Sequence, residues 1–330
     1  MRRNKMIIPL LCTGLLMTCM TGCGAAGNDA GAGDEVRIDE NTDASDDAEA
    51  SDSTNADEIT VEVTAADEKS SSDTQNENEQ AESESVEDED MFEGLGLSIL
   101  GDSISTYDGY IPEGFAVMYP HAGDVTDVSQ TWWMKLLEDT GMELCSNDSS
   151  SGSTCIGDSK SIDDPKVACS DYRISLLVGA QGRMPDVIIV YMGTNDLLIG
   201  MELGDNDGTK VVEDEKIWNF SDAYTMILDK LASDYPAAQV YCCTLAPIGD
   251  WGTDQPFVTF TNHRGLTFED YSERIRVIAN NKGIPVMDLT DCGIGIDNLD
   301  EMTSDGVHLT PDGMECVERA MLETMGFAQE

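Results

Sequence analysis

Basic side chains are scarce in this chain of 330 residues, which carries 18 Lys and Arg against 65 Asp and Glu and a formal net charge of −47. Nucleic-acid binding needs clustered Lys and Arg that displace phosphate counterions, so the composition argues against it. The same imbalance disfavours polyanionic substrates and anionic lipid head groups, because a negative surface repels both. A neutral substrate fits this charge better.

Metal-binding patterns are also missing. The chain has only three histidines, and its ten cysteines show no Cys-x-x-Cys spacing, so neither a zinc site nor a metallophosphoesterase is indicated. The run Asp205-Asn206-Asp207-Gly208 has part of a calcium-loop pattern without the full series of ligands, which favours a solvated acidic loop. We expect no metal and no cofactor. The Gly-x-Ser-x-Gly elbow of α/β-hydrolases is absent as well.

No apolar run at the N-terminus is long enough for an ordinary membrane span. The stretch Met6–Met20 follows basic residues and has the length of a signal peptide. It ends in Met20-Thr21-Gly22-Cys23, which resembles a bacterial lipobox. That resemblance implies a lipoprotein signal peptide over residues 1–22, lipidation of Cys23 and a mature chain anchored on the outer face of a membrane. The alternative is a secretory signal with a chance cysteine.

Aromatic residues are absent from residues 24–90, where Asp, Glu, Ser, Thr, Asn, Ala and Gly dominate and Arg37 and Lys69 are the only basic residues. Such a segment cannot bury enough apolar surface to offset its chain entropy, and its charges repel one another. We therefore predict an acidic, disordered tether over residues 23–90. A tail that binds a cationic partner is the alternative.

Residues 91–330 are sufficient for one α/β domain. Short apolar runs alternate with helical patterns, which predicts a doubly wound sheet of about five parallel strands with helices on both faces. Cys155 and Cys169 are candidates for a disulfide in an exported protein. The expected strands cover 95–100, 142–146, 186–191, 239–244 and 285–289; the expected helices cover 130–139, a segment that starts at the cap Ser221 and stops before Pro236, 267–281 and 311–325.

Four short polar blocks follow these strands. They are Gly101-Asp102-Ser103, Asn147–Gly152, Gly193-Thr194-Asn195-Asp196 and Asp305-Gly306-Val307-His308. In open parallel sheets the ligand crevice lies beyond the carboxyl ends of the strands. We therefore expect the four blocks to converge there.

The blocks contain the parts of a nucleophilic site. A serine hydroxyl attacks well only when a base accepts its proton and a third group orients that base. Ser103 is the candidate nucleophile, His308 the base, and Asp305, three residues earlier, the orienting carboxylate. His121 and His263 have no carboxylate at such a spacing, whereas for His308 the alternative is a surface histidine in a turn.

Together the blocks resemble the SGNH (GDSL-type) esterase and acylhydrolase family over residues 95 to 325. The resemblance implies a flavodoxin-like strand order of 2-1-3-4-5. It also implies an oxyanion hole made of the backbone N–H groups of Ser103 and Gly152 and the side-chain amide of Asn195. A flexible loop at Gly152 and a plain turn residue at Asn195 are the alternatives. In the family the positions of Asp102 and Asp196 support their loops locally.

The leading hypothesis is a surface-anchored serine esterase that removes small O-acyl groups, acetyl above all, from carbohydrate through an acyl-enzyme. The alternatives are a lysophospholipase or lipase-like acylhydrolase, and a glycan-binding lipoprotein without activity. Trp132-Trp133 is a candidate for sugar contact or for helix packing. The loop Ala246–Thr267, with Trp251, Phe257 and Phe260, is a candidate wall of the pocket.

Overall fold

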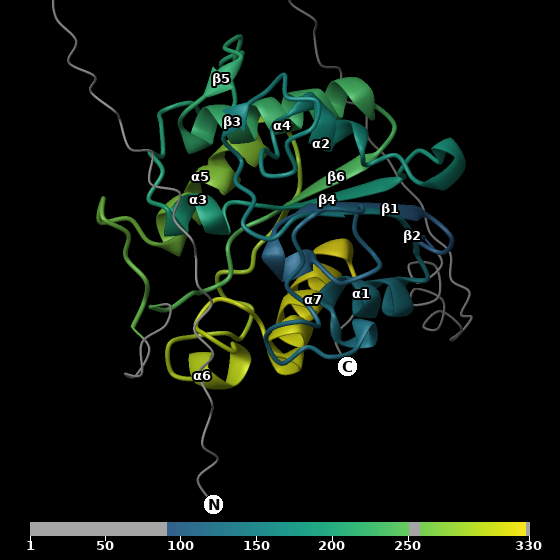
Figure 1. Cartoon of the computed structure of the whole chain (residues 1–330), viewed down its shortest axis with the longest axis vertical. Helices are drawn as coiled ribbons and strands as arrows, with labels where there is room; N and C mark the ends of the chain where they lie inside the picture. Colours follow the sequence, from purple (N-terminus) through teal and green to yellow (C-terminus); the bar gives the residue numbers. More distant parts are fainter. Residues whose placement is uncertain (1–90, 251–257, 328–330) are drawn as a thin grey trace, which may run out of the picture. The chain divides into compact units, whose positions relative to one another are not determined.

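The computed structural model describes residues 91–250 and 258–327 (Figure 1). The predicted signal peptide, Cys23 and the acidic tether lie outside the described residues, as do Trp251 and Phe257 of the candidate pocket loop.

Five parallel strands form one sheet in the order β2-β1-β4-β6-β7. Counted over the five expected strands, this order is 2-1-3-4-5, so the predicted fold class is confirmed. The fifth strand is shorter than expected. A separate antiparallel pair, β3-β5, was not predicted, because two-residue strands leave no periodic pattern. The strands are β1 Gly96–Gly101, β2 Glu143–Ser149, β3 Gly157–Asp158, β4 Val187–Tyr191, β5 Lys216–Ile217, β6 Gln239–Cys243 and β7 Val286–Met287.

Strand β4 lies at the centre of the sheet and is buried along its whole length. Its side chains alternate between two apolar clusters, one on each face: Ile188 and Val190 point into the first, Ile189 and Tyr191 into the second. A continuous Val/Ile run is what burial on both faces demands.

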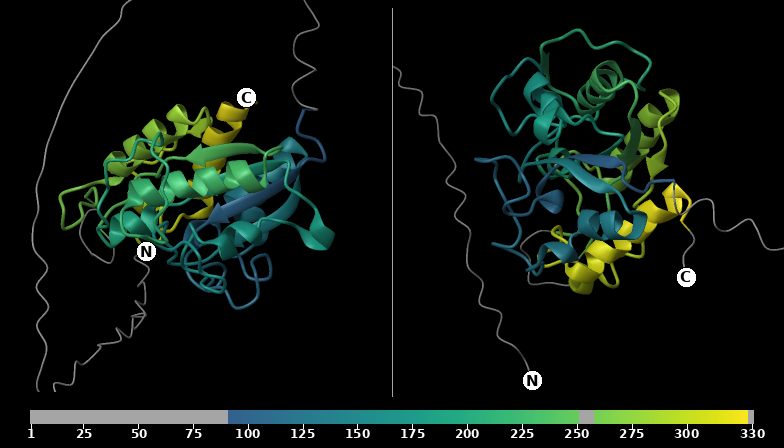
Figure 2. Two further views of the ribbon diagram at one scale, coloured as in Figure 1. Left: turned by 90° about the horizontal axis from the view of Figure 1, so that it is seen from above. Right: turned by 90° about the vertical axis from the view of Figure 1, so that its right-hand side faces the viewer.

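Helices cover both faces of the sheet. Helices α1 and α7 pack on one face, and α2, α4 and α5 pack on the other (Figures 1 and 2). The helices are α1 Trp132–Thr140, α2 Asp171–Ser175, α3 Thr194–Leu198, α4 Phe220–Asp234, α5 Phe268–Asn281, α6 Leu299–Met302 and α7 Pro311–Met325, with 3-10 turns η1 Ser103–Ser105, η2 Val128–Gln130 and η3 Ala180–Gly182.

Polar caps fix where the long helices begin and end. Helix α1 ends at Gly141 in the left-handed conformation, as predicted. The predicted cap of α4 was wrong. Asn219, not Ser221, is the N-cap, and its side chain accepts the Asp222 N–H at 2.9 Å. The Ser221 hydroxyl instead donates to the Leu203 carbonyl.

All seven cysteines of the described part are free thiols, Cys155 and Cys169 included. Cys242 and Cys243 are fully buried in β6, where they pack as small apolar residues. Within residues 91–250 and 258–327, no helix combines the length and the apolar character that a membrane crossing requires.

A buried carboxyl on α7 makes the stability of the domain depend on pH. Glu318 is 3% exposed, and its Oε1 has no hydrogen-bond partner. Burial, followed by the nearby Asp139, raises the pKa of Glu318 from 4.5 to about 7. Since the folded-state pKa exceeds the unfolded one, this group stabilises the fold fully below pH ~4.5, and that contribution is lost as the pH rises through about 7.

We therefore expect Glu318→Gln to raise the free energy of unfolding by roughly 2 kcal/mol at pH 8 and by much less at pH 4.5. Urea titrations at both pH values measure this change in the free energy of unfolding. The exposed Glu323→Gln on the same helix is the control. An equal gain at both pH values would contradict the assignment.

Candidate active site

Ser103 lies in a tight turn directly after β1. The Asp102 side chain caps this turn by accepting the Ile104 N–H at 3.0 Å, and the Thr106 hydroxyl donates to the Ser103 carbonyl at 2.9 Å. Ser103 itself is only 4% exposed. The turn therefore presents one hydroxyl in a nearly buried position.

Asp305 and His308 belong to a second turn, before α7. One carboxylate oxygen of Asp305 accepts the N–H groups of Val307 at 3.0 Å and His308 at 2.8 Å. The other lies 2.7 Å from His308 Nδ1. Gly306 has φ +95°, a conformation that side chains rarely adopt, so the turn needs glycine there.

The two turns meet although they are 205 positions apart: His308 Nε2 lies 3.0 Å from Ser103 Oγ. Burial acts to raise the pKa of Asp305, but hydrogen bonds from the His308 ring and the two backbone N–H groups outweigh it and lower that pKa. Asp305 is therefore ionised. Because Asp305 contacts Nδ1 of the His308 ring, Nε2 of the same ring is free to accept a proton from Ser103. The Tyr119 ring packs edge-on against the imidazole, 6.5 Å away.

The two other predicted site residues lie on neighbouring loops without a direct contact to Ser103 among the described interactions. Asn195 is in the first turn of α3, and its amide lies 3.5 Å from the Asp102 carboxylate. Gly152 follows β2 with φ +75°. Its loop is joined to the end of β1, because the Ser150 N–H donates to the Gly101 carbonyl at 3.3 Å.

Both supporting aspartates reach beyond their own loops. Asp102 caps its own turn, as expected, and its carboxylate also lies 3.5 Å from the Asn195 amide. The expectation that Asp196 also bonds locally was wrong: its carboxylate accepts the Cys155 N–H at 2.9 Å and so joins the Asn195 loop to the loop after Gly152. Burial raises the pKa of Asp102 to about 6 and that of Asp196 to about 7.

A buried ion pair below the site could not be found from the sequence. Arg173 and Asp148 are both fully buried, with Nε 2.7 Å from Oδ2. The guanidinium also donates to the carbonyls of Asp148 at 2.7 Å, Gly101 at 3.1 Å and Pro165 at 2.6 Å. Arg173 thereby ties β1 and β2 together where the nucleophile turn begins. No local sequence pattern predicts a contact of this kind.

The remaining candidates have structural roles. Trp132 and Trp133 are fully buried, and their indole N–H groups donate to the hydroxyl and the carbonyl of Ser105, so they pack against the sheet and support the nucleophile turn. His121 pairs with Asp108 at 3.1 Å on the surface. Among residues 91–250 and 258–327, no cluster of three or more His, Cys, Asp or Glu side chains is arranged to hold a metal.

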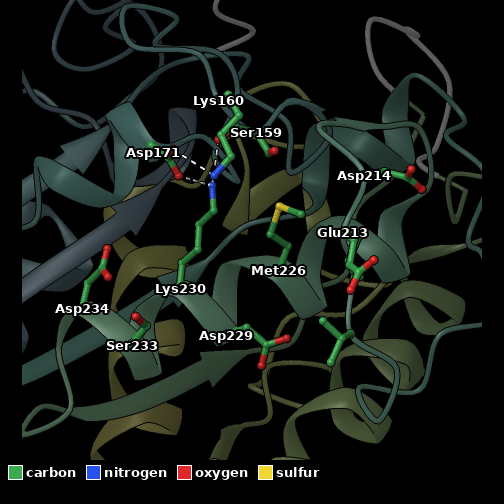
Figure 3. A pocket seen from close by; sticks show the side chains of 12 residues that line it. Ser159, Lys160, Asp171, Glu213, Asp214, Met226, Asp229, Lys230, Ser233 and Asp234 are labelled. Atoms are coloured by element: carbon green, nitrogen blue, oxygen red, sulfur yellow. Dashed lines mark hydrogen bonds and ion pairs between the residues drawn. The ribbon is translucent and has the colours of Figure 1, made fainter.

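A hollow of about 650 Å³ is lined by α4, by Asp171 at the start of α2, and by the loop residues 159–160 and 211–214. None of the predicted site residues lines it, and Figure 3 shows Lys230 reaching from α4 toward Asp171 and Ser159. The Lys230 ammonium lies 2.6 Å from the Asp171 carboxylate and donates to the Ser159 carbonyl at 2.8 Å. The hollow holds no base paired with a nucleophile, so the serine site is the candidate active site.

Comparisons with known proteins agree with this geometry. A sequence profile described as "GDSL-like Lipase/Acylhydrolase" matches residues 95–293. A solved structure described as a GDSL-like lipase from Bacteroides ovatus is 27% identical over 70% of this chain and 98% of its own, with a TM-score of 0.51. A second, from Bacteroides uniformis, is 26% identical over 70% and 95%, with a TM-score of 0.52. A search of curated proteins finds no match.

The Arg173–Asp148 pair yields a stability prediction. Burial raises the pKa of Asp148 to about 6 although Arg173 opposes it, so desolvation outweighs the attraction of the pair. We expect Arg173→Met to destabilise the domain by roughly 3–5 kcal/mol, because it leaves a buried, unpaired carboxylate. Asp148→Leu combined with Arg173→Met should recover much of that loss in urea titrations. A double variant as unstable as the single one would contradict this account.

Proposed function

Because the chain belongs to the GDSL-like lipase/acylhydrolase family and is thus a carboxylic ester hydrolase, we propose that Ser103, His308 and Asp305 are its catalytic triad. The observation that carries the proposal is the continuous series of contacts from Ser103 Oγ to His308 Nε2 at 3.0 Å and from His308 Nδ1 to Asp305 at 2.7 Å. The nucleophile, the base and the orienting carboxylate are thus in contact in the order that serine catalysis requires.

In the first half-reaction, Ser103 Oγ attacks the ester carbonyl carbon while His308 Nε2 accepts the hydroxyl proton. Asp305 stabilises the imidazolium that results. The carbonyl oxygen becomes an oxyanion, for which the N–H groups of Ser103 and Gly152 and the amide of Asn195 are the donors, each worth about 3 kcal/mol. His308 then donates its proton to the leaving alcohol oxygen, and the acyl group stays on Ser103.

In the second half-reaction, His308 accepts a proton from water, whose oxygen attacks the acyl-enzyme. Collapse of the second tetrahedral intermediate releases the carboxylic acid and returns the proton to Ser103. The water takes the place of the alcohol, so one set of residues serves both steps.

The proposed substrates carry small O-acyl groups, acetyl above all, on carbohydrate. Ser103 is 4% exposed and the Tyr119 ring packs against His308, which favours a short acyl chain. The excess of acidic side chains favours a neutral polymer over an anionic lipid surface. A lysophospholipase or lipase-like acylhydrolase is the alternative within the family, and a glycan-binding protein without turnover is the alternative outside it.

We expect the domain to hydrolyse p-nitrophenyl acetate and to release acetate from acetylated xylan, and to cleave octanoate or longer esters poorly. Ser103→Ala should lower kcat/KM by on the order of 10⁴-fold or more, while the exposed Ser175→Ala has no effect. An organophosphonate should add to Ser103 alone, as mass spectrometry would show. Undiminished hydrolysis by Ser103→Ala would exclude the triad, and a preference for long acyl chains would exclude the carbohydrate assignment.

We also propose that Cys23 is lipidated, so that residues 23–90 tether the domain to the outer face of a membrane. The lipobox-like Met20–Cys23 supports this. In a bacterial host, Cys23→Ser should abolish incorporation of labelled fatty acid and move the protein out of the membrane fraction. Cys19→Ser, which changes a cysteine within the signal region, is the control. An unlabelled parent protein would contradict the proposal.

A further inference from the structure

Gly152 lies in a four-residue turn, Ser150–Ser153. The Ser153 N–H donates to the Ser150 carbonyl at 3.1 Å, and Gly152, the third residue, has φ +75°. Among the described non-glycine residues only Gln181 has a positive φ, so Ser151 has a negative one. This combination defines a type II turn.

The central peptide of this turn decides where the Gly152 N–H points. It joins Ser151 to Gly152, and because a trans peptide is planar, the Ser151 carbonyl and the Gly152 N–H point in opposite directions. Type I and type II turns differ by about half a rotation of this peptide. A group that holds the carbonyl on one side therefore holds the N–H on the other.

Lys166 holds that carbonyl. Its ammonium donates to the Ser151 carbonyl oxygen, and a Cβ added at Gly152 would lie 3.3 Å from Nζ. The backbone of Lys166 is bonded to the same loop, since its carbonyl accepts the Thr154 N–H at 2.9 Å. Lys166 is an exposed residue, and in the described part of the chain the Ser151 carbonyl is the protein group that its ammonium contacts.

The rest of the turn is fixed around this contact. The N–H groups of Ser150 and Ser151 donate to the carbonyls of Gly101 at 3.3 Å and Ala116 at 2.7 Å. By contrast, no oxygen of residues 91–250 and 258–327 accepts the Gly152 N–H. The one N–H left without a protein acceptor is the one that the oxyanion hole needs.

We propose that Lys166 is a positioning residue of the oxyanion hole: by binding the Ser151 carbonyl it orients and polarises the Ser151–Gly152 peptide, so that the Gly152 N–H faces the developing oxyanion. This inference rests on the proposed function. A cation on the carbonyl strengthens the partial positive charge on the N–H of the same peptide, because hydrogen bonds in series polarise one another. The oxyanion is absent from the bound substrate and develops only in the tetrahedral intermediates and the transition states beside them, so the effect should fall on kcat.

The charge of Lys166 is sensitive to pH. Desolvation and the Arg173 guanidinium lower the pKa of Lys166, and Asp164 opposes them. The Arg173 guanidinium and the Asp164 carboxylate are the charged groups that face the Lys166 ammonium. As the pH rises, the ammonium loses its proton and its polarising effect, which should add a decline in kcat on the alkaline side.

The test compares Lys166→Met with Lys166→Arg. We expect Lys166→Met to lower kcat roughly tenfold to a hundredfold, less than the loss of a whole oxyanion donor, with KM nearly unchanged. Lys166→Arg keeps the charge and the donors and should restore most of the rate. Lys216→Met is the matched control, because it removes one exposed lysine that has no contact with the turn.

Two further measurements separate this role from a general loss of structure. Lys166→Met should still be labelled stoichiometrically on Ser103 by an organophosphonate, and its affinity for an alkyl boronic acid, which forms an anionic tetrahedral adduct, should fall by the same factor as kcat. In Lys166→Arg the alkaline decline of kcat should move to higher pH, which tests the proposal even if Lys166→Met unfolds. Wild-type kcat in Lys166→Met, or an unmoved alkaline limb in Lys166→Arg, would overturn it. Activity that survives Ser103→Ala would instead refute the triad.

Discussion

The carbonyl of Gly101 is the point on which the site depends. It ends β1 two residues before Ser103, and it accepts from the Ser150 N–H at 3.3 Å, the Arg173 guanidinium at 3.1 Å and the Ser153 hydroxyl at 3.4 Å. One oxygen therefore joins the strand that carries the nucleophile to the loop that carries Gly152. The position must be glycine for steric reasons, because a Cβ there would lie 2.5 Å from Ser149 Oγ.

The carboxylates around the Gly101 carbonyl differ in the direction of their pKa shifts. Asp102, Asp148 and Asp196 are fully buried, and in each case desolvation raises the pKa above the usual aspartate value. Asp305 is the exception, because three donors within its own turn outweigh desolvation. The carboxylate beside the imidazole is thus held ionised by its own turn. Asp102 also interacts with this ring, since the attraction of His308 opposes the rise in the pKa of Asp102. Asp148 pairs with Arg173, and Asp196 accepts the Cys155 N–H.

The sequence predicts what is periodic or local, and misses what is long-range. The five strands follow from apolar runs and their order from the family resemblance, and the blocks after the strands correctly indicate that Ser103 and His308 meet. The N-cap of α4 was harder to predict. Asn219 and Ser221 are both good N-cap residues, and only the path of the preceding chain decides between them. Arg173, Lys166 and the reach of Asp196 to Cys155 gave no signal, because each contact joins segments whose proximity depends on the complete fold.

His308 and Asp305 are three residues apart in one turn, and that turn is closed by the Asp305 carboxylate, which contacts both the His308 backbone N–H and the His308 ring. The pair of His308 and Asp305 is therefore formed by short-range folding, within the turn that precedes α7. Only the gap to the hydroxyl must be set by packing across the sheet. Evolution can accordingly lengthen or replace the connections between the intervening strands, and so reshape the approach to the substrate, without disturbing the geometry of proton transfer within the pair.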